Sequence, residues 1–373
     1  MGSTFKLGRV MGISIELHPS WLVIAFLVTY LLAAVQFPST YPHWAPPLYW
    51  GVAALTAILF LGSVLSHELS HAVVARRFGV KVTAITLFVF GGAANLEEEP
   101  KRPRDEALIA LAGPLSSLVA GGALWLVFLL VSQPQAEALL GWLAVMNISL
   151  GAFNLVPGFP MDGGRILRAL LWRLRGDRFA ATRNAAAVGR LFGYLIIALG
   201  VLIAFSPRGL LPGIYLALIG WFLSNAAEAA VAQMSVERSL RGVKVRDVMD
   251  PDPPSVTPNE SVNDLIHERM LRGEHRTFLV RHDDGGLAGI VTLSDVRRTP
   301  REQWEEARVT DIMTRFGDLA TVTPDDEVED ALRLLSTKGA NQLPVLGEGR
   351  AVAGLLTRSA ITRLIETRLK LGV

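Results

Sequence analysis

The sequence predicts a polytopic α-helical membrane protein, with about six transmembrane helices followed by a C-terminal soluble α/β domain pair. Three observations carry this prediction. Of the 373 residues, 51% are hydrophobic. Six apolar runs are long enough to cross the bilayer core as helices. Beyond about residue 235 the apolar runs become short and the charged residues dense, as expected of a soluble domain.

The six apolar runs follow one another along the first two thirds of the chain. They lie at residues 21–37, 49–74, 107–131, 138–156, 185–205 and 210–231. A helix needs roughly 17–25 residues to span the hydrocarbon core. Each run therefore predicts one transmembrane helix.

Basic residues are distributed unevenly between the two ends of these spans. The connections at 37–44 and 132–135 contain neither Lys nor Arg, and the connection at 206–209 contains only Arg208. The opposite ends carry many: Lys6, Arg9, Arg76, Arg77, Lys81, Lys101, Arg102, Arg104, Arg165, Arg168, Arg173, Arg175, Arg178, Arg238, Arg241, Lys244 and Arg246. Because cytoplasmic loops are enriched in Lys and Arg, we expect a multi-pass protein of the cell (plasma or inner) membrane with both termini in the cytoplasm. A formal net charge of +2 gives no reason to expect a nucleic-acid partner.

The tail after the last span contains an internal repeat. VRDVM at Val245 returns as VTDIM at Val309, and GIVTLSDV at Gly289 returns as GLLTRSAI at Gly354, a period of about 65 residues. Each copy is expected to contain a helix, two short strands and a final helix. We therefore divide the chain into a membrane domain at 1–235, a linker at 236–243 and two repeat domains at 244–300 and 308–368.

The second span contains the sequence HELSH, from His67 to His71, inside an otherwise apolar run. On a helix the two histidines lie one turn apart on one face, so both imidazoles can bind one Zn²⁺ while Glu68 addresses a water beside the metal. A charged group at the centre of a membrane helix costs about 2.5–3.5 kcal/mol on insertion scales. A bound metal would offset that cost.

Two imidazoles leave a catalytic zinc site one protein ligand short. The chain contains no cysteine, so the missing ligand must be His, Asp or Glu. Asp162 is the best candidate because NLVPGFPMDGGR follows the fourth span and returns to the depth of His67. The surrounding Pro and Gly residues break the helix, which is tolerated at membrane depth where the backbone lines a cavity. The alternative role for Asp162 is to cap a helix that begins near Arg165.

HELSH in one span and NLVPGFPMDGGR after a later one resemble the paired signature of the site-2 protease family, the intramembrane zinc metalloproteases of peptidase family M50. The resemblance covers essentially the whole chain. It implies a zinc metalloendopeptidase that holds one Zn²⁺ per chain through His67, His71 and Asp162. It further implies that Glu68 is the catalytic acid and base and that Asn154 hydrogen-bonds the substrate or the oxyanion. The implied substrate is a transmembrane protein, such as an anti-sigma factor or another membrane-tethered regulator, cleaved in regulated intramembrane proteolysis.

The segment FVFGGAANLEEE, which begins at Phe88, resembles the family's glycine-containing strand region beside the active site. Independently of that resemblance, the Gly91–Gly92 pair permits close approach of another backbone. An unwound substrate could therefore pair with this stretch as an added β-strand. The alternative is a plain loop.

The repeated tail resembles the cystathionine β-synthase-type (CBS) pair, which in many proteins binds adenine nucleotides. In the first copy, the resemblance implies that Thr292 and Ser294 approach phosphate and that Asp295 binds the ribose hydroxyls of AMP, ADP or ATP. Ala360 occupies the place of that aspartate in the second copy. Any ribonucleotide site should therefore favour the first copy. A purely structural pair that joins two chains as a homodimer remains the alternative.

Other classes of membrane protein also fit part of the pattern. A CBS-regulated ion transporter or channel keeps buried charges along its pathway, but here the ionisable residues gather in two motifs on one side of the membrane. A receptor that only binds metal would have no use for Glu68. The basic stretch from Arg165 to Arg178 is expected to lie on membrane lipid and to carry no chemistry.

Overall fold

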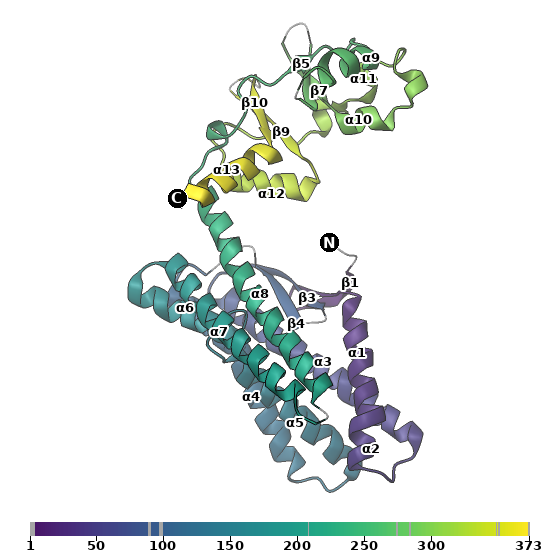
Figure 1. Cartoon of the computed structure of the whole chain (residues 1–373), viewed down its shortest axis with the longest axis vertical. Helices are drawn as coiled ribbons and strands as arrows, with labels where there is room; N and C mark the ends of the chain where they lie inside the picture. The colour runs from purple at the N-terminus through teal and green to yellow at the C-terminus, as the bar shows by residue number, and fades with distance from the viewer. Residues whose placement is uncertain are drawn as a thin grey trace. The chain divides into compact units, whose positions relative to one another are not determined.

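The computed structural model describes residues 4–88, 91–96, 100–207, 209–273, 275–282, 285–347, 349 and 351–371. Contacts within the chain divide it into two compact units, Met1–Ala232 and Gln233–Val373. The first unit is dominated by long helices, and the second combines short strands and helices (Figure 1).

The long helices of the first unit are named in chain order. They are α1 (Ser20–Leu31), continued by the π-helical turn η1 (Leu32–Gln36) and by α2 (Phe37–Thr40), then α3 (Pro46–Arg77), α4 (Pro103–Phe128), α5 (Pro134–Asn154), α6 (Asp162–Arg175), α7 (Arg178–Ala204) and α8 (Leu210–Leu240). Within the described part of the chain, six segments are long and apolar enough to cross a membrane: Ser20–Thr40, α3, α4, α5, α7 and α8. The predicted six spans are confirmed.

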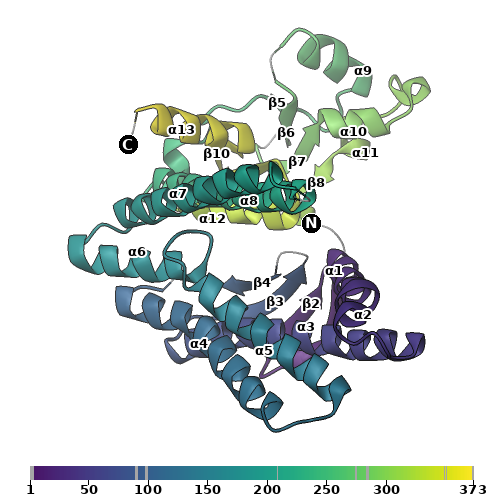
Figure 2. The same cartoon turned by 60° about the horizontal axis from the view of Figure 1, so that its bottom comes forward.

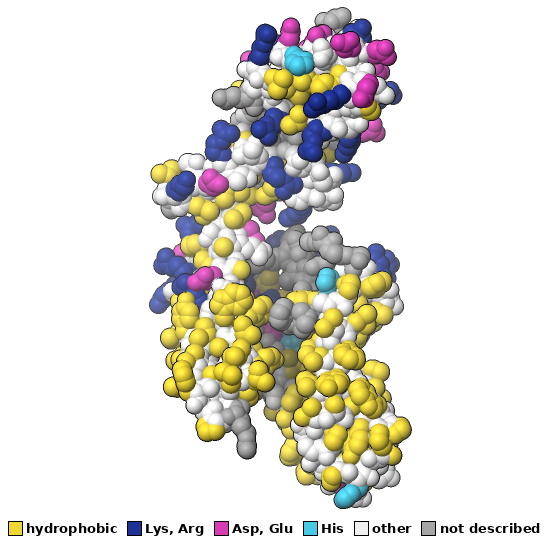
Figure 3. All heavy atoms as spheres, turned by 45° about the vertical axis from the view of Figure 1, so that its right-hand side comes forward, with side chains coloured by type: hydrophobic (Ala, Val, Ile, Leu, Met, Phe, Trp, Pro, Cys, Tyr) yellow, Lys and Arg dark blue, Asp and Glu magenta, His cyan; other side chains and the backbone are white. Residues whose placement is uncertain are grey.

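The surface of the helical unit is apolar. Large hydrophobic side chains such as Phe26, Leu126 and Leu202 are more than half exposed on α1, α4 and α7. Figure 3 shows hydrophobic side chains covering this face of the helices, whereas Lys, Arg, Asp and Glu are dense over the second unit. Apolar side chains exposed over so wide an area need lipid and not water as their solvent.

Small residues hold the helices together. A Cβ atom added at Gly200 of α7 would lie 2.6 Å from the backbone nitrogen of Ala217 in α8, and one at Gly193 would lie 2.7 Å from the carbonyl oxygen of Gly220. Helix backbones this close exclude any larger side chain. Lipid gives no hydrophobic drive for helix association, so van der Waals contact of this kind has to supply it.

A four-stranded sheet lies beside the end of α3 that carries HELSH (Figure 2). Its strands are β1 (Phe5–Val10), β2 (Ile13–Leu17), β3 (Val82–Phe88) and β4 (Gly91–Leu96), in that order, with β2 and β3 parallel and the other pairs antiparallel. Ile15 and Ile85 pack with Ala72 of α3 in one core. The segment expected to approach substrate is thus partly a strand, β4, while residues 89–90 and 97–99 lie outside the described residues.

The second unit contains the predicted repeat. The first copy comprises the 3₁₀ turn η2 (Val245–Asp247), β5 (Ser255–Val256), α9 (Val262–Asp264), the π-helical η3 (Leu265–Met270), β6 (Thr277–Arg281), β7 (Leu287–Thr292), α10 (Leu293–Arg298) and the 3₁₀ turn η4 (Arg301–Gln303). The second comprises α11 (Val309–Ile312), β8 (Thr314–Arg315), the 3₁₀ turn η5 (Phe316–Asp318), α12 (Val328–Lys338), β9 (Gln342–Leu346), β10 (Val352–Thr357) and α13 (Arg358–Leu371). The predicted membrane bundle followed by a soluble α/β pair is confirmed.

The junction between membrane helix and repeat is itself ordered. Helix α8 continues to Leu240, through most of the stretch that we expected to be a linker. Leu240 and Val243 are buried in the core of the second copy with Val328 and Leu335. The start of the tail is therefore part of a folded core.

Candidate metal centre and catalytic site

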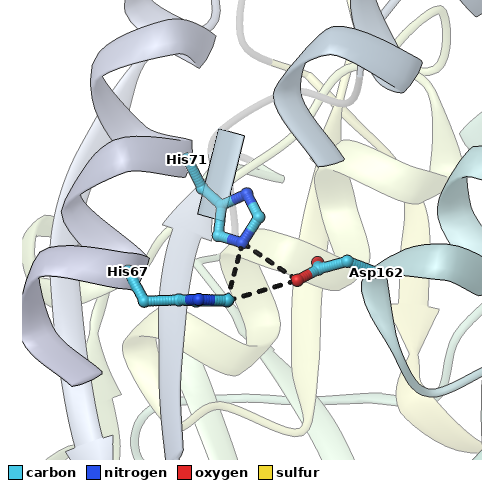
Figure 4. A group of neighbouring side chains, drawn as sticks. All are labelled: His67, His71 and Asp162. Atoms are coloured by element: carbon cyan, nitrogen blue, oxygen red, sulfur yellow. Dashed lines mark hydrogen bonds and ion pairs between the residues drawn. The ribbon is translucent and has the colours of Figure 1, made fainter. Parts of the chain in front are cut away.

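The two histidines of HELSH occupy one face of α3, and Asp162 is the first residue of α6. Both imidazoles are buried, with 4% and 6% of His67 and His71 exposed. Figure 4 shows the three side chains pointing toward one another from separate parts of the chain. The structure thus brings together residues that are more than 90 positions apart in sequence.

The three donor atoms form a small triangle. Nε2 of His67 lies 3.3 Å from Nε2 of His71, and Oδ2 of Asp162 lies 3.3 Å from the first and 3.1 Å from the second. Zinc bonds to imidazole and carboxylate are about 2.0–2.2 Å long, which makes the edges of a zinc tetrahedron about 3.3–3.6 Å. The observed triangle therefore has close to the size of one face of such a tetrahedron.

Helix α4 supports both rings from behind. Nδ1 of His71 donates to the carbonyl oxygen of Ile109 at 2.7 Å, and Nδ1 of His67 lies 2.9 Å from the hydroxyl of Ser117. A carbonyl only accepts, so we infer that His71 carries its proton on Nδ1 and turns the lone pair of Nε2 toward Asp162. Lone pairs that converge on one point need a cation between them. The residues therefore fit a zinc ion.

Gly113 makes room for this arrangement. A Cβ atom added at Gly113 of α4 would lie 2.6 Å from Nε2 of His67 and closer still to Nε2 of His71. Ile109, Gly113 and Ser117 are spaced at four residues and so share one face of α4. None of the three was singled out from the sequence. The small residues at Gly113, Ser117 and Gly121 could have indicated a close helix contact.

Glu68 lies against strand β4. A Cβ atom added at Gly92 would be 2.8 Å from Cδ of Glu68 and closer still to its Cγ. Glu68 is half-buried and follows His67 on the same turn of α3. The glycine therefore gives the carboxylate space to lie between the ligand-bearing helix and the edge strand of the sheet.

Close backbone packing fixes the loop that delivers Asp162. A Cβ atom at Gly158 would lie 2.6 Å from Cα of Gly189 in α7, and one at Gly163 would lie 2.5 Å from the carbonyl oxygen of Leu155. Met161, with an extended backbone, is the residue that precedes the helix, and Asp162 stands in the first turn. Its Oδ2 atom faces the imidazoles, as a ligand would, and does not cap α6.

Asn154 ends α5, eight residues before Asp162. Its amide nitrogen donates to the carbonyl oxygen of Leu150 in its own helix, at 3.0 Å. The side chain is half-buried. The structure therefore places Asn154 at the start of the loop that carries Asp162, with its amide directed along α5.

Arg168 corrects the expectation that the whole basic stretch lies on membrane lipid. Its side chain is buried, with 7% of the residue exposed, and its Nε donates to Oε1 of Glu106 at 2.6 Å. Glu106 is completely buried in the first turn of α4. Helix α6 within this stretch is amphipathic, and Arg168 belongs to its inner face.

The residues expected to bind nucleotide lie where β7 meets α10. Oδ2 of Asp295 accepts hydrogen bonds from the backbone nitrogen of Thr292 at 2.9 Å and from its hydroxyl at 2.7 Å, while Ser294 is exposed. A cavity of about 550 Å³ beside α10 is lined by residues that include Leu293, Val296 and Trp304. In the second copy, Thr357 and Ser359 line a cavity of about 680 Å³.

Known proteins are similar to this chain along most of its length. The family model for Peptidase family M50 matches residues 55–199, and that for the CBS domain matches residues 245–302 and 309–367. The chain is 37% identical over 370 residues to the Rip3 protein of Mycobacterium tuberculosis, covering 98% of this chain and 94% of that protein. It is 31% identical over 368 residues to the zinc metalloprotease MJ0392 of Methanocaldococcus jannaschii, covering 97% of this chain and 96% of that protein.

A solved structure is also similar. The site-2 protease from Methanocaldococcus jannaschii is 32% identical, with a TM-score of 0.44, over 61% of this chain and 95% of that one. Similarity along nearly the full length of two relatives, together with the matched families, shows where the chain belongs. It is a member of peptidase family M50, the site-2 protease family: a multi-pass membrane zinc metalloprotease with a C-terminal pair of CBS domains.

Proposed function

We propose that this metalloprotease cleaves transmembrane segments of membrane-tethered proteins, at a zinc ion held by His67, His71 and Asp162. The triangle of donor atoms 3.1–3.3 Å apart carries this proposal. The burial of both imidazoles within an apolar bundle supports a substrate that arrives through lipid. We assign the catalytic role to residues 1–235 and a regulatory role to residues 244–300 and 308–368, joined by residues 236–243.

The residues around the triangle have separate tasks in peptide hydrolysis. When bound, zinc would polarise the scissile carbonyl and lower the pKa of a water to about 7. Glu68 accepts the proton of the attacking water and then donates it to the leaving amine. Asn154 carries two N–H donors, so it can keep its bond to Leu150 and offer the other hydrogen to the substrate carbonyl oxygen.

Strand β4 provides a place for the substrate backbone. It is the last strand of its sheet and pairs with β3 on one side, among the described strands. A transmembrane helix must be unwound before its peptide bonds can react, and pairing with an edge strand satisfies the groups that unwinding frees. Gly92 brings that edge against Glu68. Cleavage should therefore fall in the segment that pairs with β4.

The experiment is cleavage of a panel of single-span reporter proteins by the purified chain in detergent, with product masses determined to locate the cut. The proposal predicts a cut inside the span, loss of cleavage when zinc is removed by a chelator, and recovery when Zn²⁺ is returned. Cuts confined to soluble loops of the reporters would contradict an intramembrane role. Cleavage that persists without metal would contradict the zinc site.

The orientation follows from charge. Basic residues cluster at the ends of the spans that carry HELSH and the Asp162 loop, which supports a cytoplasmic location for the site, both termini and the CBS pair in a cell membrane. Digestion of the CBS pair by an added protease in sealed vesicles of known sidedness measures this orientation. Digestion by a protease that reaches only the extracytoplasmic side would contradict it.

We further propose that an adenine nucleotide bound at Thr292, Ser294 and Asp295 regulates cleavage. Thr292 donates to Oδ2 of Asp295, and Oδ1 lies 3.8 Å from the Arg298 guanidinium, so a ribose hydroxyl that donates to Oδ1 would share this oxygen with Arg298. The cavity beside α10 has a volume typical of small-ligand sites, but it is lined by Leu293 and Val296 and not by Thr292, Ser294 or Asp295, so it supports the proposal only by lying next to them. Calorimetry with AMP, ADP and ATP on the whole chain should show binding that Asp295→Asn weakens. Asp311→Asn is the matched control because Asp311 caps α11 in the same way. Equal binding by both variants would remove Asp295 from the site.

A further inference from the structure

A buried ion pair links the helix that supports the imidazoles to the helix that carries the third ligand. Glu106 in α4 is 0% exposed and Arg168 in α6 is 7% exposed. The guanidinium Nε donates to Oε1 of Glu106 at 2.6 Å, and its NH2 group also contacts Oε1. Both contacts fall on Oε1, and Oε2 of Glu106 is buried without a hydrogen-bond partner among the described residues, so the pair is costly to remove from water.

Glu106 lies on α4, the helix that contacts both imidazoles, and Arg168 lies on α6, the helix that carries Asp162. Along α4, Glu106 shares one buried face with Ile109, Gly113 and Ser117. Ile109 and Ser117 bond the imidazoles, and Gly113 lies against them. The carboxylate of Glu106 therefore lies on the same helix that sets the orientation of both rings.

On the other side, Arg168 reaches both parts of the chain that position Asp162. It lies six residues after Asp162 in α6, and its Cζ atom lies 5.2 Å from the centroid of the Phe159 ring. Phe159 is buried in the loop just before Asp162, against Gly189 of α7. One guanidinium thus joins α4, α6 and the delivering loop.

We propose that Glu106 and Arg168 are positioning residues that hold the Asp162 carboxylate at coordination distance from His67 and His71. This inference rests on the metal site proposed above. The two imidazoles come from one helix and are fixed by it, but Asp162 comes from a different helix behind an irregular loop. A ligand set must be held to within about 0.5 Å, so a tie between the two helices is needed.

The alternative is an ion pair that only stabilises the fold. Replacing one partner by a neutral residue leaves an uncompensated buried charge, which destabilises any fold, so single variants that remove a charge do not separate the two roles. Replacing both partners with apolar residues of similar volume is often neutral for stability. The double variant Glu106→Met with Arg168→Met therefore removes the tie between the helices and leaves no buried charge.

The experiment compares this double variant with the wild type as whole chains in detergent. Three quantities are measured: the unfolding temperature of the metal-free protein, the zinc dissociation constant by competition with a chelator, and the absorption spectrum with Co²⁺ in place of zinc. We expect an unfolding temperature close to that of the wild type, zinc bound roughly 10–100-fold more weakly, and a changed Co²⁺ spectrum. The matched control is Arg190→Met with Glu228→Met, which removes an exposed pair between α7 and α8 and should change none of the three.

A double variant with wild-type zinc affinity and a wild-type Co²⁺ spectrum would overturn the inference. If the double variant does not fold, Arg168→Lys decides, because it keeps the charge but lacks the planar fork of the guanidinium. We expect it to fold and to bind zinc about tenfold more weakly; wild-type affinity would again overturn the inference. Failure of the wild type to bind zinc would instead overturn the proposed metal site.

Discussion

Asp162 and Asp295 both stand in the first turn of a helix, but their carboxylates do different work. Asp295 turns back on its own helix, where Oδ2 accepts two hydrogen bonds from Thr292. Asp162 turns away from α6 and faces two imidazoles of α3. A carboxylate that accepts from the backbone and hydroxyl of a residue beside its own helix stabilises local structure. A carboxylate that meets lone pairs from another helix marks a place for a cation.

The largest effect in this comparison should come from filling the space beside the imidazoles. Gly113→Ala puts a methyl group where the metal-binding nitrogens lie, so we expect loss of bound zinc and of all cleavage. Metal analysis and cleavage of a single-span reporter measure both. Gly122→Ala on the same helix is the control, because a Cβ atom there meets nothing within 4 Å. Normal zinc content in Gly113→Ala would contradict the geometry of the site.

The next effect separates metal binding from proton transfer. The three atoms nearest to a Cβ atom at Gly92 all belong to Glu68, so we expect Gly92→Ala to lower kcat about 100-fold while zinc stays bound. Steady-state kinetics with metal analysis of the same samples checks this. Gly62→Ala, in open space on α3, should leave both unchanged. Equal kcat in the two variants would mean that Glu68 does not depend on strand β4 for its position.

A smaller effect is expected behind the rings. Ser117→Ala removes the partner of Nδ1 of His67, and such outer contacts typically contribute about 10–100-fold to metal affinity. We expect a loss near the lower end of this range, since His67 stays buried in the bundle. The neighbouring Ser116→Ala is the control, because its hydroxyl donates to the carbonyl oxygen of Gly113 in its own helix and not, among the described residues, to an imidazole. Chelator competition should distinguish the two variants, and equal affinities would exclude the Ser117 contact.

The smallest effect on the metal centre is expected from a change at Asp295. Asp295→Ala removes a helix cap and should lower the free energy of unfolding of the CBS pair by about 1 kcal/mol without changing zinc content. Chemical unfolding followed in the tail, with metal analysis, tests both statements. A drop in zinc content would show that the two aspartates are not independent.

The sequence alone predicted the spans and the repeated tail well, because both depend on composition and periodicity. It also led to His67, His71 and Asp162, since HELSH places two ligands one turn apart and the segment after the fourth span returns Asp162 to that depth. It did not lead to Gly113, Ser117 or Glu106. Their importance comes from the way α4 packs on α3 and α6, and no local pattern records which face of a helix meets which neighbour.

The burial of Arg168 could not be predicted from the sequence either. Its neighbours Arg165 and Arg173 share its charge, and nothing in the run of arginines tells which of them turns inward. The pairing with Glu106 depends on a contact across 62 positions. Charge patterns of this kind predict an amphipathic helix but not the partner of each residue.

The central claim is that one zinc ion at His67, His71 and Asp162 works with Glu68 as acid and base. The most direct test measures zinc stoichiometry and cleavage in the same preparations of the wild type, Glu68→Gln and Asp162→Ala. The account predicts one zinc per chain with cleavage in the wild type, one zinc without cleavage in Glu68→Gln, and neither in Asp162→Ala. Cleavage by Glu68→Gln, or full zinc content in Asp162→Ala, would contradict it.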